Sequence, residues 1–144
     1  MTELEKQLMR HEGSNKDKNG RHLLYKDTVF KLTIGYGRNL DDVGISEEEA
    51  LFMLANDIKR ADEQLIKNLP WTDKLDRVRH DILVNMCFNM GIGGLLQFKN
   101  TLSLIKKGRC REASIEMLKS RWAKQVGSRA IELSKQMKTG EYKR

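Results

Sequence analysis

Leu23 to Gly37 read LLYKDTVFKLTIGYG, a stretch of this 144-residue chain that has the composition of β-strands. Aromatic and β-branched residues lie on both sides of a turn candidate, KDTV, and Gly35 and Gly37 end the segment. Almost everywhere else the chain is rich in Leu, Lys, Glu, Met and Arg, and it has a single proline, which favours helices. The segment therefore predicts a β-hairpin or short sheet in a protein that is mainly α.

Helical patterns lie on both sides of this hairpin. Before it, the capping box of Thr2 and Glu5 begins a helix over residues 2–12, which Gly13 ends. The next residues, GSNKDKNGRH, have no periodicity and predict an exposed loop. After the hairpin, a second capping box begins a long helix that ends before the proline and is long enough to bridge two lobes. Shorter helices are expected at residues 73–90, 99–107, 109–124 and 128–138.

These elements predict one domain over residues 1–144. Its fold class is mainly α, of the α+β type, with a small β-containing lobe. Its expected parts are a small β-containing lobe (13–45), a connecting helix (46–69) and a C-terminal helical bundle (70–144). The helix over residues 2–12 is expected to pack on the bundle. An apolar content of 39% is enough for a core, and the sequence shows no internal repeat.

The chain carries a net charge of +7 and has a pI of about 9.5. This charge attracts polyanions. It fits three partners equally well: nucleic acid, an anionic membrane face and an anionic cell wall. Lys and Arg are spread over every segment among acids, whereas a DNA-binding module gathers them on one helix face. The N-terminal residues show no signal-peptide pattern, and no run approaches the ~20 apolar residues of a membrane span. We therefore expect synthesis in the cytoplasm, no stable membrane insertion and no nucleic-acid partner.

Several classes of site are excluded by the residues. Cys87 and Cys110 lie in predicted helices and are expected to be idle thiols. The three histidines, His11, His22 and His80, do not have the spacing of metal ligands. The GYG and GIGG segments lack the other residues of a phosphate loop, and serine nucleophile motifs are absent. No metal and no cofactor are expected, which leaves carboxylates as the candidates for chemistry.

Glu12 is the most unusual carboxylate, because it falls on the apolar face of the first helix at its C-terminal end. The partial negative charge of that end and burial both favour the protonated carboxyl group. A carboxyl group that stays protonated near neutral pH is what a general acid requires. The alternative is a surface acid at a frayed helix end.

Asp27 lies in the turn of the hairpin, and Thr33 lies on its returning strand. An aspartate in a turn usually accepts hydrogen bonds from its own backbone. Together with Glu12, an aspartate and a threonine hydroxyl also describe an inverting glycosidase site, in which an acid and a base flank a water. On the residues alone, both interpretations stay open.

The series HEG, YKDT, TIGYG, NMCFNMGIGGLLQFKNTL and KSRW with SRA covers nearly the whole chain. In order and spacing it resembles the lysozymes of T-even bacteriophages, the phage-type muramidase family. The resemblance implies a lysozyme-like fold with an active-site cleft between two lobes. It implies that Glu12 is the general acid, and that Asp27 and Thr33 hold the water that attacks C1 from the opposite face. The implied substrate is the β-1,4 bond between N-acetylmuramic acid and N-acetylglucosamine in peptidoglycan.

The resemblance also implies residues that bind substrate. Arg129 matches the arginine that pairs with the acidic glutamate across the cleft, and Asn89 stands where the family usually has a cleft glutamine. The other residues at or beside cleft positions are Phe88, Asn100, Thr101 and Gln125. Phe88 and Trp122 also fit helical apolar stripes, so a place in the core is the alternative for both.

The chain departs from the family at three places. Residues 13–26 separate Glu12 from Asp27, which is a longer loop than the family has, so NKDKNG looks inserted and is expected to bulge outward. Arg38 stands where the family has a histidine, which removes a structural ion-pair possibility but no catalytic group. The segment NLDDVG is short, so the small lobe is expected to be reduced.

The leading hypothesis is a monomeric, bacteriolytic endolysin. By family analogy, it accumulates in the host cytoplasm and reaches the periplasm through a pore that another protein forms. One alternative is a non-catalytic basic helical module that binds cell wall or nucleic acid. A second is a lytic transglycosylase, which cleaves the same bond without water, and the presence of Asp27 and Thr33 argues against it.

Overall fold

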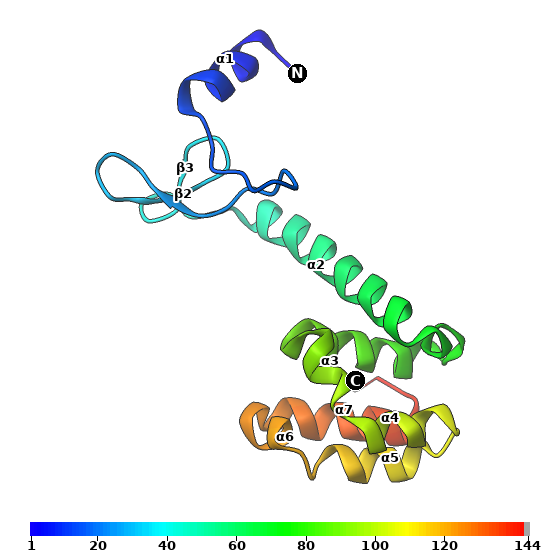
Figure 1. The fold of residues 1–144 in the computed structure, drawn as a ribbon. Helices are drawn as coiled ribbons and strands as arrows, with labels where there is room; N and C mark the ends of the chain where they lie inside the picture. The colour runs from blue at the N-terminus through cyan, green and yellow to red at the C-terminus, as the bar shows by residue number, and fades with distance from the viewer. Residues whose placement is uncertain (143–144) are drawn as a thin grey trace. The chain divides into compact units, whose positions relative to one another are not determined.

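The computed structural model describes residues 1–142 and confirms a mainly α protein with a small antiparallel sheet near the N-terminus (Figure 1). The first part of the chain contains α1 (Glu3–Glu12), β1 (Tyr25–Lys26), β2 (Leu32–Ile34), β3 (Arg38–Asn39) and α2 (Glu47–Asn68). The remainder contains the 3-10 helix η1 (Pro70–Lys74), α3 (Arg77–Leu96), α4 (Lys99–Lys106), α5 (Cys110–Met117), α6 (Arg121–Val126) and α7 (Ser128–Thr139). No helix within residues 1–142 is both long and apolar enough to cross a membrane.

The chain divides into two compact units, Met1–Phe52 and Met53–Arg144, which we call the N-terminal and C-terminal units. The division falls within α2. The lobe boundaries expected from the sequence, and the packing of the first helix on the helical bundle, stay predictions.

Two capping boxes and a sheet organise the N-terminal unit. At the start of α1, the Glu5 backbone N–H donates to Thr2 Oγ1 (3.0 Å) and the Thr2 N–H donates to Glu5 Oε2 (2.7 Å). Ser46 and Glu49 make the same pair of bonds at the start of α2. The sheet has the order β1-β2-β3 and is antiparallel throughout. The predicted β-hairpin or short sheet is therefore confirmed: β1 and β2 form the hairpin, and β3 adds a third strand.

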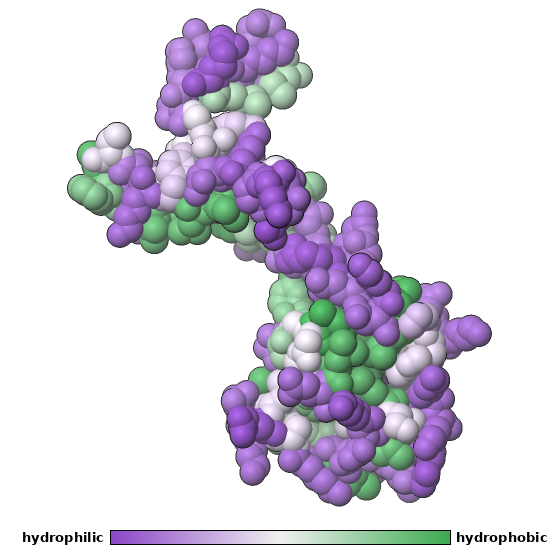
Figure 2. Space-filling view, viewed as in Figure 1, coloured by the Kyte–Doolittle hydropathy of each residue, from purple (hydrophilic) through white to green (hydrophobic). Residues whose placement is uncertain are grey.

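In the C-terminal unit, α5 packs against α7 and α4, and α3 and α6 also pack against α7 (Figure 1). Within residues 1–142, all buried apolar side chains lie in this unit; they include Leu65, Ile82, Leu83, Met86, Leu95, Ile105, Met117 and Met137. In contrast, apolar side chains of the N-terminal unit such as Leu4, Leu8 and Phe30 are exposed. Apolar patches interrupt the polar surface over much of the visible face (Figure 2).

Of two predicted helix boundaries in this unit, one is confirmed and one is wrong. The helix expected to end at Met90 does end there, because Gly91 leaves the helical conformation (φ 79°), and a second helical segment, counted with it as α3, continues to Leu96. The single helix expected over residues 109–124 is two helices, because the Ser120 side chain accepts from the Ala123 N–H and begins α6 there. Cys87 is buried, Cys110 is partly buried, and both are free thiols.

One buried polar side chain joins three elements of the C-terminal unit. His80 of α3 has its Nδ1 2.9 Å from the carbonyl oxygen of Thr72 and its Nε2 2.7 Å from Asp62 Oδ1. Both partners are acceptors, so both ring nitrogens donate only when the imidazole is protonated. Burial lowers the pKa of His80, but these hydrogen bonds and the charge of Asp62 outweigh it, and the pKa is raised overall.

Candidate active site

Glu12 is the last residue of α1, and its side chain is exposed. It lies against Gly37, in the turn between β2 and β3. A Cβ atom added to Gly37 would come within 3.2 Å of both Cγ and Oε2 of Glu12. Gly37 also has a φ of +90°, a conformation that favours glycine. The glycine therefore serves two purposes here: it allows the turn, and it leaves room for the Glu12 carboxylate.

Asp27 follows β1 and holds the hairpin turn together. Its Oδ1 accepts hydrogen bonds from the backbone N–H groups of Val29 and Lys31, both at 2.9 Å. The Asp27 N–H donates to the Lys31 carbonyl (3.0 Å), and the Asp27 carbonyl accepts from the Phe30 N–H (3.0 Å). The expected backbone role of this aspartate is thus confirmed. Within residues 1–142, no protein group donates to its second oxygen, Oδ2, which is free to act on another molecule.

Thr33 lies on the central strand β2 and is 3% exposed. Its hydroxyl donates to the Lys31 carbonyl (2.9 Å), the same oxygen that accepts from the Asp27 N–H. The Lys31 carbonyl therefore connects the threonine to the aspartate. Because the hydroxyl proton is used in this bond, the lone pairs of Thr33 Oγ1 are what the side chain offers to a further partner.

The segment expected to be inserted before β1 lies in the exposed loop that the sequence predicts, and this loop forms a small hairpin of its own. Lys16 and His22 form an antiparallel bridge. At the base of the hairpin, the Leu23 N–H donates to the Asn15 carbonyl (2.7 Å), and Asn15 Nδ2 donates to the Leu24 carbonyl (3.1 Å). We call residues 15–24 the inserted hairpin.

The inserted hairpin packs on Tyr36, the residue between the two glycines of the β2–β3 turn. The ring of His22 meets that of Tyr36 edge-on with 4.9 Å between centroids, and Lys16 Nζ lies 5.1 Å from the centre of the Tyr36 ring. The next residue is Gly37, against which Glu12 lies. The insertion therefore supports the turn that carries the contact with Glu12.

The turn of the inserted hairpin repeats the backbone hydrogen bonds of the Asp27 turn ten residues earlier, but Asp17 Oδ2 also accepts from Arg21 Nε (2.6 Å) in an ion pair that Asp27 lacks. Asp17 Oδ1 accepts from the N–H groups of Asn19 and Arg21, both at 2.9 Å. The Asp17 N–H donates to the Arg21 carbonyl and the Gly20 N–H donates to the Asp17 carbonyl, both at 3.0 Å. The backbone N–H of Arg21 is the main cause that lowers the pKa of Asp17. The sequence shows no repeat because only Lys, Asp and the closing basic residue recur.

Arg38 makes an ion pair where the sequence suggested that one was lost. Its guanidinium donates to both carboxylate oxygens of Glu49, at 2.8 and 2.6 Å, and to the Gly44 carbonyl at 3.1 Å. The side-chain bond from Arg38 and the N–H of Ser46 lower the pKa of Glu49 to about 2. The departure from histidine thus replaces one structural pair with another, which fixes β3 to the start of α2.

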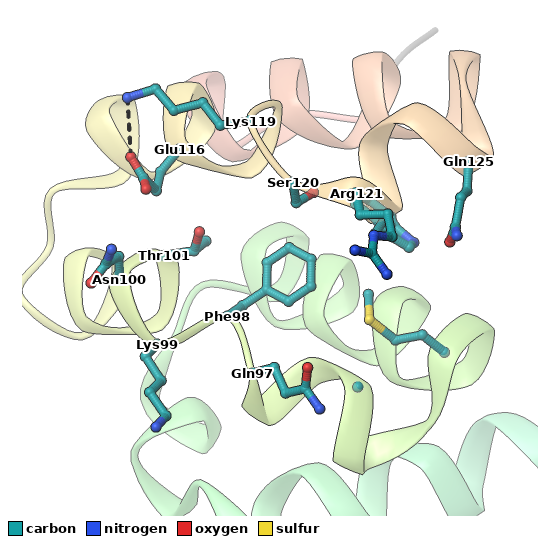
Figure 3. A pocket seen from close by; sticks show the side chains of 13 residues that line it. Gln97, Phe98, Lys99, Asn100, Thr101, Glu116, Lys119, Ser120, Arg121 and Gln125 are labelled. Carbon is teal, nitrogen blue, oxygen red and sulfur yellow. Dashed lines mark hydrogen bonds and ion pairs between the residues drawn. The ribbon is translucent and has the colours of Figure 1, made fainter.

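A pocket of about 420 Å³ in the C-terminal unit brings together Asn100, Thr101 and Gln125, three of the residues implied as substrate-binding (Figure 3). Phe98 points into it, and Trp122 and Met90 also line it. The remaining lining residues are mostly polar and charged: Gln97, Lys99, Glu116, Lys119, Ser120 and Arg121. Apolar rings beside amides suit a ligand with both apolar faces and hydrogen-bonding groups.

Asn89 supports this pocket through Trp122. The indole Nε1 donates to Asn89 Oδ1 (2.8 Å), and the Trp122 ring meets Phe98 edge-on at 5.9 Å. Trp122 is 6% exposed, so its expected place in the core is confirmed. Phe98 and Arg121 were not predicted as site residues, although both lie within the motifs NMCFNMGIGGLLQFKNTL and KSRW that carry the family resemblance.

A second pocket of about 350 Å³ contains the other two implied residues, Phe88 and Arg129. Leu54, Ile58 and Val84 provide apolar walls, and Tyr142 donates a short hydrogen bond to Asp81 at its edge. Phe88 is 46% exposed, so its alternative place in the core is wrong. The structure therefore distributes the implied binding residues over two pockets of the C-terminal unit.

Comparison with known proteins identifies the family of this chain. A family model described as phage lysozyme matches residues 16–138, a range that includes Asp27 and Thr33 and begins just after Glu12. The probable T4-type lysozyme 1 of Dictyostelium discoideum is 29% identical over 128 residues, which are 87% of this chain and 74% of the relative. The probable T4-type lysozyme 2 of the same organism is 28% identical over 130 residues, 90% of this chain and 76% of the relative. With its mainly α fold and a family match over most of its length, this chain belongs to the phage lysozyme family and is a lysozyme-type glycosidase.

Proposed function

We propose that the protein is a muramidase that hydrolyses the β-1,4 bond between N-acetylmuramic acid and N-acetylglucosamine in peptidoglycan, with inversion at C1. The observation that carries the proposal is the arrangement of the N-terminal unit. Glu12 lies against the turn that follows β2, and the Lys31 carbonyl joins Asp27, in the hairpin turn, to Thr33 on the returning strand. An inverting glycosidase needs an acid on one side of the sugar and a water-binding base on the other.

In this mechanism Glu12 gives its proton to the glycosidic oxygen as the bond to C1 breaks. A water donates one hydrogen bond to Asp27 Oδ2 and one to the lone pairs of Thr33 Oγ1. Its oxygen attacks C1 from the opposite face, and the proton that it loses passes to Asp27. The backbone bonds to Asp27 Oδ1 keep the carboxylate in one orientation throughout.

The C-terminal unit supplies the binding groups in this proposal. The pocket with Asn100, Thr101 and Gln125 combines aromatic and amide side chains, which suits N-acetylated sugars and the attached peptides. Following the family resemblance, Arg129 and Phe88 also bind substrate. The net charge of +7 attracts the enzyme to the anionic wall.

Two substitutions test the acid and the base. Glu12→Gln should abolish lysis of outer-membrane-permeabilised Gram-negative cells while the melting temperature stays the same, whereas Glu3→Gln on the same helix should keep full activity. Asp27→Asn should remove most of the rate. Asp17→Asn is its control in the equivalent turn: it changes the same backbone bonds and also breaks the Asp17–Arg21 ion pair, so it should cost at least as much stability and keep the rate. Full lysis by Glu12→Gln, or equal losses in Asp17→Asn and Asp27→Asn, would contradict these assignments.

The products distinguish hydrolysis from transglycosylation. Mass spectrometry of the released muropeptides should show reducing ends and no anhydro-muramyl ends, because water is the nucleophile. The first anomer formed, observed by proton NMR, should be the α anomer. An anhydro-muramyl product would instead identify a lytic transglycosylase, and binding without any product would identify a wall-binding module.

The setting of the enzyme is part of the proposal. Following the family resemblance, a phage enzyme of this kind is made in the host cytoplasm and reaches the periplasm through a pore formed by another protein. The two relatives above come from an amoeba, so the resemblance alone supports this route. Expression in a Gram-negative host should cause lysis when a pore-forming protein is co-expressed, and no lysis when the enzyme is expressed alone.

A further inference from the structure

Phe30 combines two unfavourable properties in the Asp27 turn. It is the one residue other than glycine with a positive φ (63°) within residues 1–142. That conformation is strained for an aromatic side chain, because the Cβ atom crowds the backbone. The side chain is also 79% exposed, so it gains little from packing. The fold therefore does not explain why a phenylalanine stands here.

The inserted hairpin provides an internal comparison. Gly20 occupies the position of Phe30 in the equivalent turn, three residues after the aspartate, and it donates the same hydrogen bond to the aspartate carbonyl. Its φ is +83°, and a Cβ atom added there would meet nothing within 4 Å. The same turn thus forms with glycine, which is unstrained in this conformation. Phenylalanine in the second turn costs stability that glycine would not.

Backbone strain and exposed aromatic rings are both characteristic of binding sites. Phe30 lies three residues after Asp27 and next to Val29, which is 66% exposed and whose N–H binds the Asp27 carboxylate. A ligand that reaches Asp27 Oδ2 is therefore close to this apolar tip. Pyranose rings have one apolar face of C–H groups, which matches the flat surface of an aromatic ring.

We propose that Phe30 is a substrate-binding residue whose ring packs on the apolar face of a sugar in the glycan strand. The proposal rests on the proposed function, because it takes Asp27 as the residue that holds the attacking water. The ring adds contact area with the bound glycan. The strained backbone keeps the ring at the tip of the turn that carries Asp27.

Three variants separate binding from folding. Phe30→Gly and Phe30→Asn suit a positive φ, so their melting temperatures should equal or exceed that of the wild type. Their KM for soluble, uncrosslinked peptidoglycan strands should rise about three- to tenfold, as expected for loss of one aromatic contact, while kcat stays within about twofold. Phe30→Tyr should keep the KM of the wild type, because it keeps the ring.

Gly20→Phe is the matched control for strain. It places the same residue at a similar positive φ, where an added Cβ meets nothing within 4 Å, so it should lower the melting temperature and leave KM unchanged. Together, the four variants should show that phenylalanine costs stability in both turns but supports binding in only one.

Several results would overturn the proposal. An unchanged KM in Phe30→Gly, or a raised KM in Phe30→Tyr, would show that the ring does not bind glycan. A lower melting temperature in Phe30→Gly would give the ring a structural role, and a changed mass by light scattering would show that it contacts a second copy. In all these cases the wild type still cleaves peptidoglycan, whereas a wild type without activity would instead contradict the proposed function.

Discussion

At the residue scale, the candidate site depends both on a missing side chain, at Gly37, and on polar atoms of Asp27 and Thr33 that remain able to bind a water. Gly37 lacks a side chain where the Glu12 carboxylate lies, and Asp27 leaves one oxygen without a protein donor within the described chain. Thr33 uses its only proton on a backbone carbonyl, which leaves its lone pairs for a water. The backbone bonds to Asp27 and Thr33 thus fix the orientation of both side chains, as preorganised sites require.

The first prediction concerns Gly37. Gly37→Ala should destabilise the protein by about 1–2 kcal/mol because alanine is strained at a positive φ, and its Cβ should also displace Glu12. The rate on peptidoglycan should therefore fall at least tenfold at a temperature where the variant is folded. Gly35→Ala has a similar φ but open space around the added Cβ, so it should lose stability and keep its rate. Equal rates for the two variants would exclude a role for the Gly37 contact.

The second prediction concerns His80 and pH. The pKa of His80 is higher in the folded than in the unfolded chain, so the folded state binds the proton more tightly. Its contribution to the free energy of unfolding is then complete below the unfolded pKa of about 6.5 and is lost as pH rises through the folded pKa. Melting temperatures should be measured from pH 5 to 9. The difference between the wild type and His80→Gln should be largest at the acidic end, with the variant the less stable. A difference that grows with rising pH would contradict this sign.

At the scale of elements, the inserted hairpin shows how far the sequence could predict the structure. The capping boxes, the β-hairpin and the helices were predictable because each depends on residues close together in the sequence. The hydrogen-bonded turn within the inserted hairpin was not predictable. It depends on Asp17, which makes backbone bonds like those of Asp27 although the surrounding residues differ. The contact of Glu12 with Gly37 was also unpredictable, because it depends on where α1 ends relative to a turn 25 residues later.

The same limit applies to the implied binding residues. Periodicity places Phe88, Asn100 and Gln125 on helices, but their division between two pockets depends on how α3, α4, α6 and α7 pack. The family resemblance identified these positions because it summarises a fold that short-range patterns do not determine. Trp122 fits both of its predicted places, the core and the cleft, since it is buried and still lines a pocket.

The third prediction concerns the attachment of the inserted hairpin. Tyr36→Ala should release the hairpin, because it removes the ring that His22 and Lys16 contact. Limited trypsin digestion followed by mass spectrometry should then show faster cleavage after Lys16, Lys18 and Arg21 than in the wild type. Tyr36→Phe keeps the ring and should be cleaved at the rate of the wild type. Unchanged cleavage in Tyr36→Ala would show that the hairpin's own hydrogen bonds are sufficient to hold it.

At the scale of the whole molecule, the two units differ in how they are stabilised. The C-terminal unit contains the buried apolar side chains, and burial of such surface is the main stabilising force in folding. The N-terminal unit, within residues 1–52, depends on caps, turns, a small sheet and the Arg38–Glu49 pair. All three candidate catalytic residues lie in this less buried unit, in agreement with the general occurrence of active-site segments in the less stable parts of proteins.

The fourth prediction follows from this contrast. In native-state hydrogen exchange, amides of α3 and α7 should exchange only through global unfolding, whereas those of the β-sheet and α1 should exchange through local openings of lower free energy. A soluble peptidoglycan fragment, bound to an inactive Glu12→Gln variant, should slow exchange in the sheet more than in α7. Equal protection of both units in the free protein would show that they unfold together.

The inserted hairpin closes on itself, since Asn15 bonds to Leu23 and Leu24 across its base. A segment whose two ends meet can be gained, lost or lengthened without altering the path of the chain on either side. Evolution could therefore have acquired it in a single step without moving the aspartate that follows. For the protein engineer, the tip between Lys18 and Asn19 is a natural graft point, where a foreign epitope or a surface-attachment tag can be inserted into the enzyme.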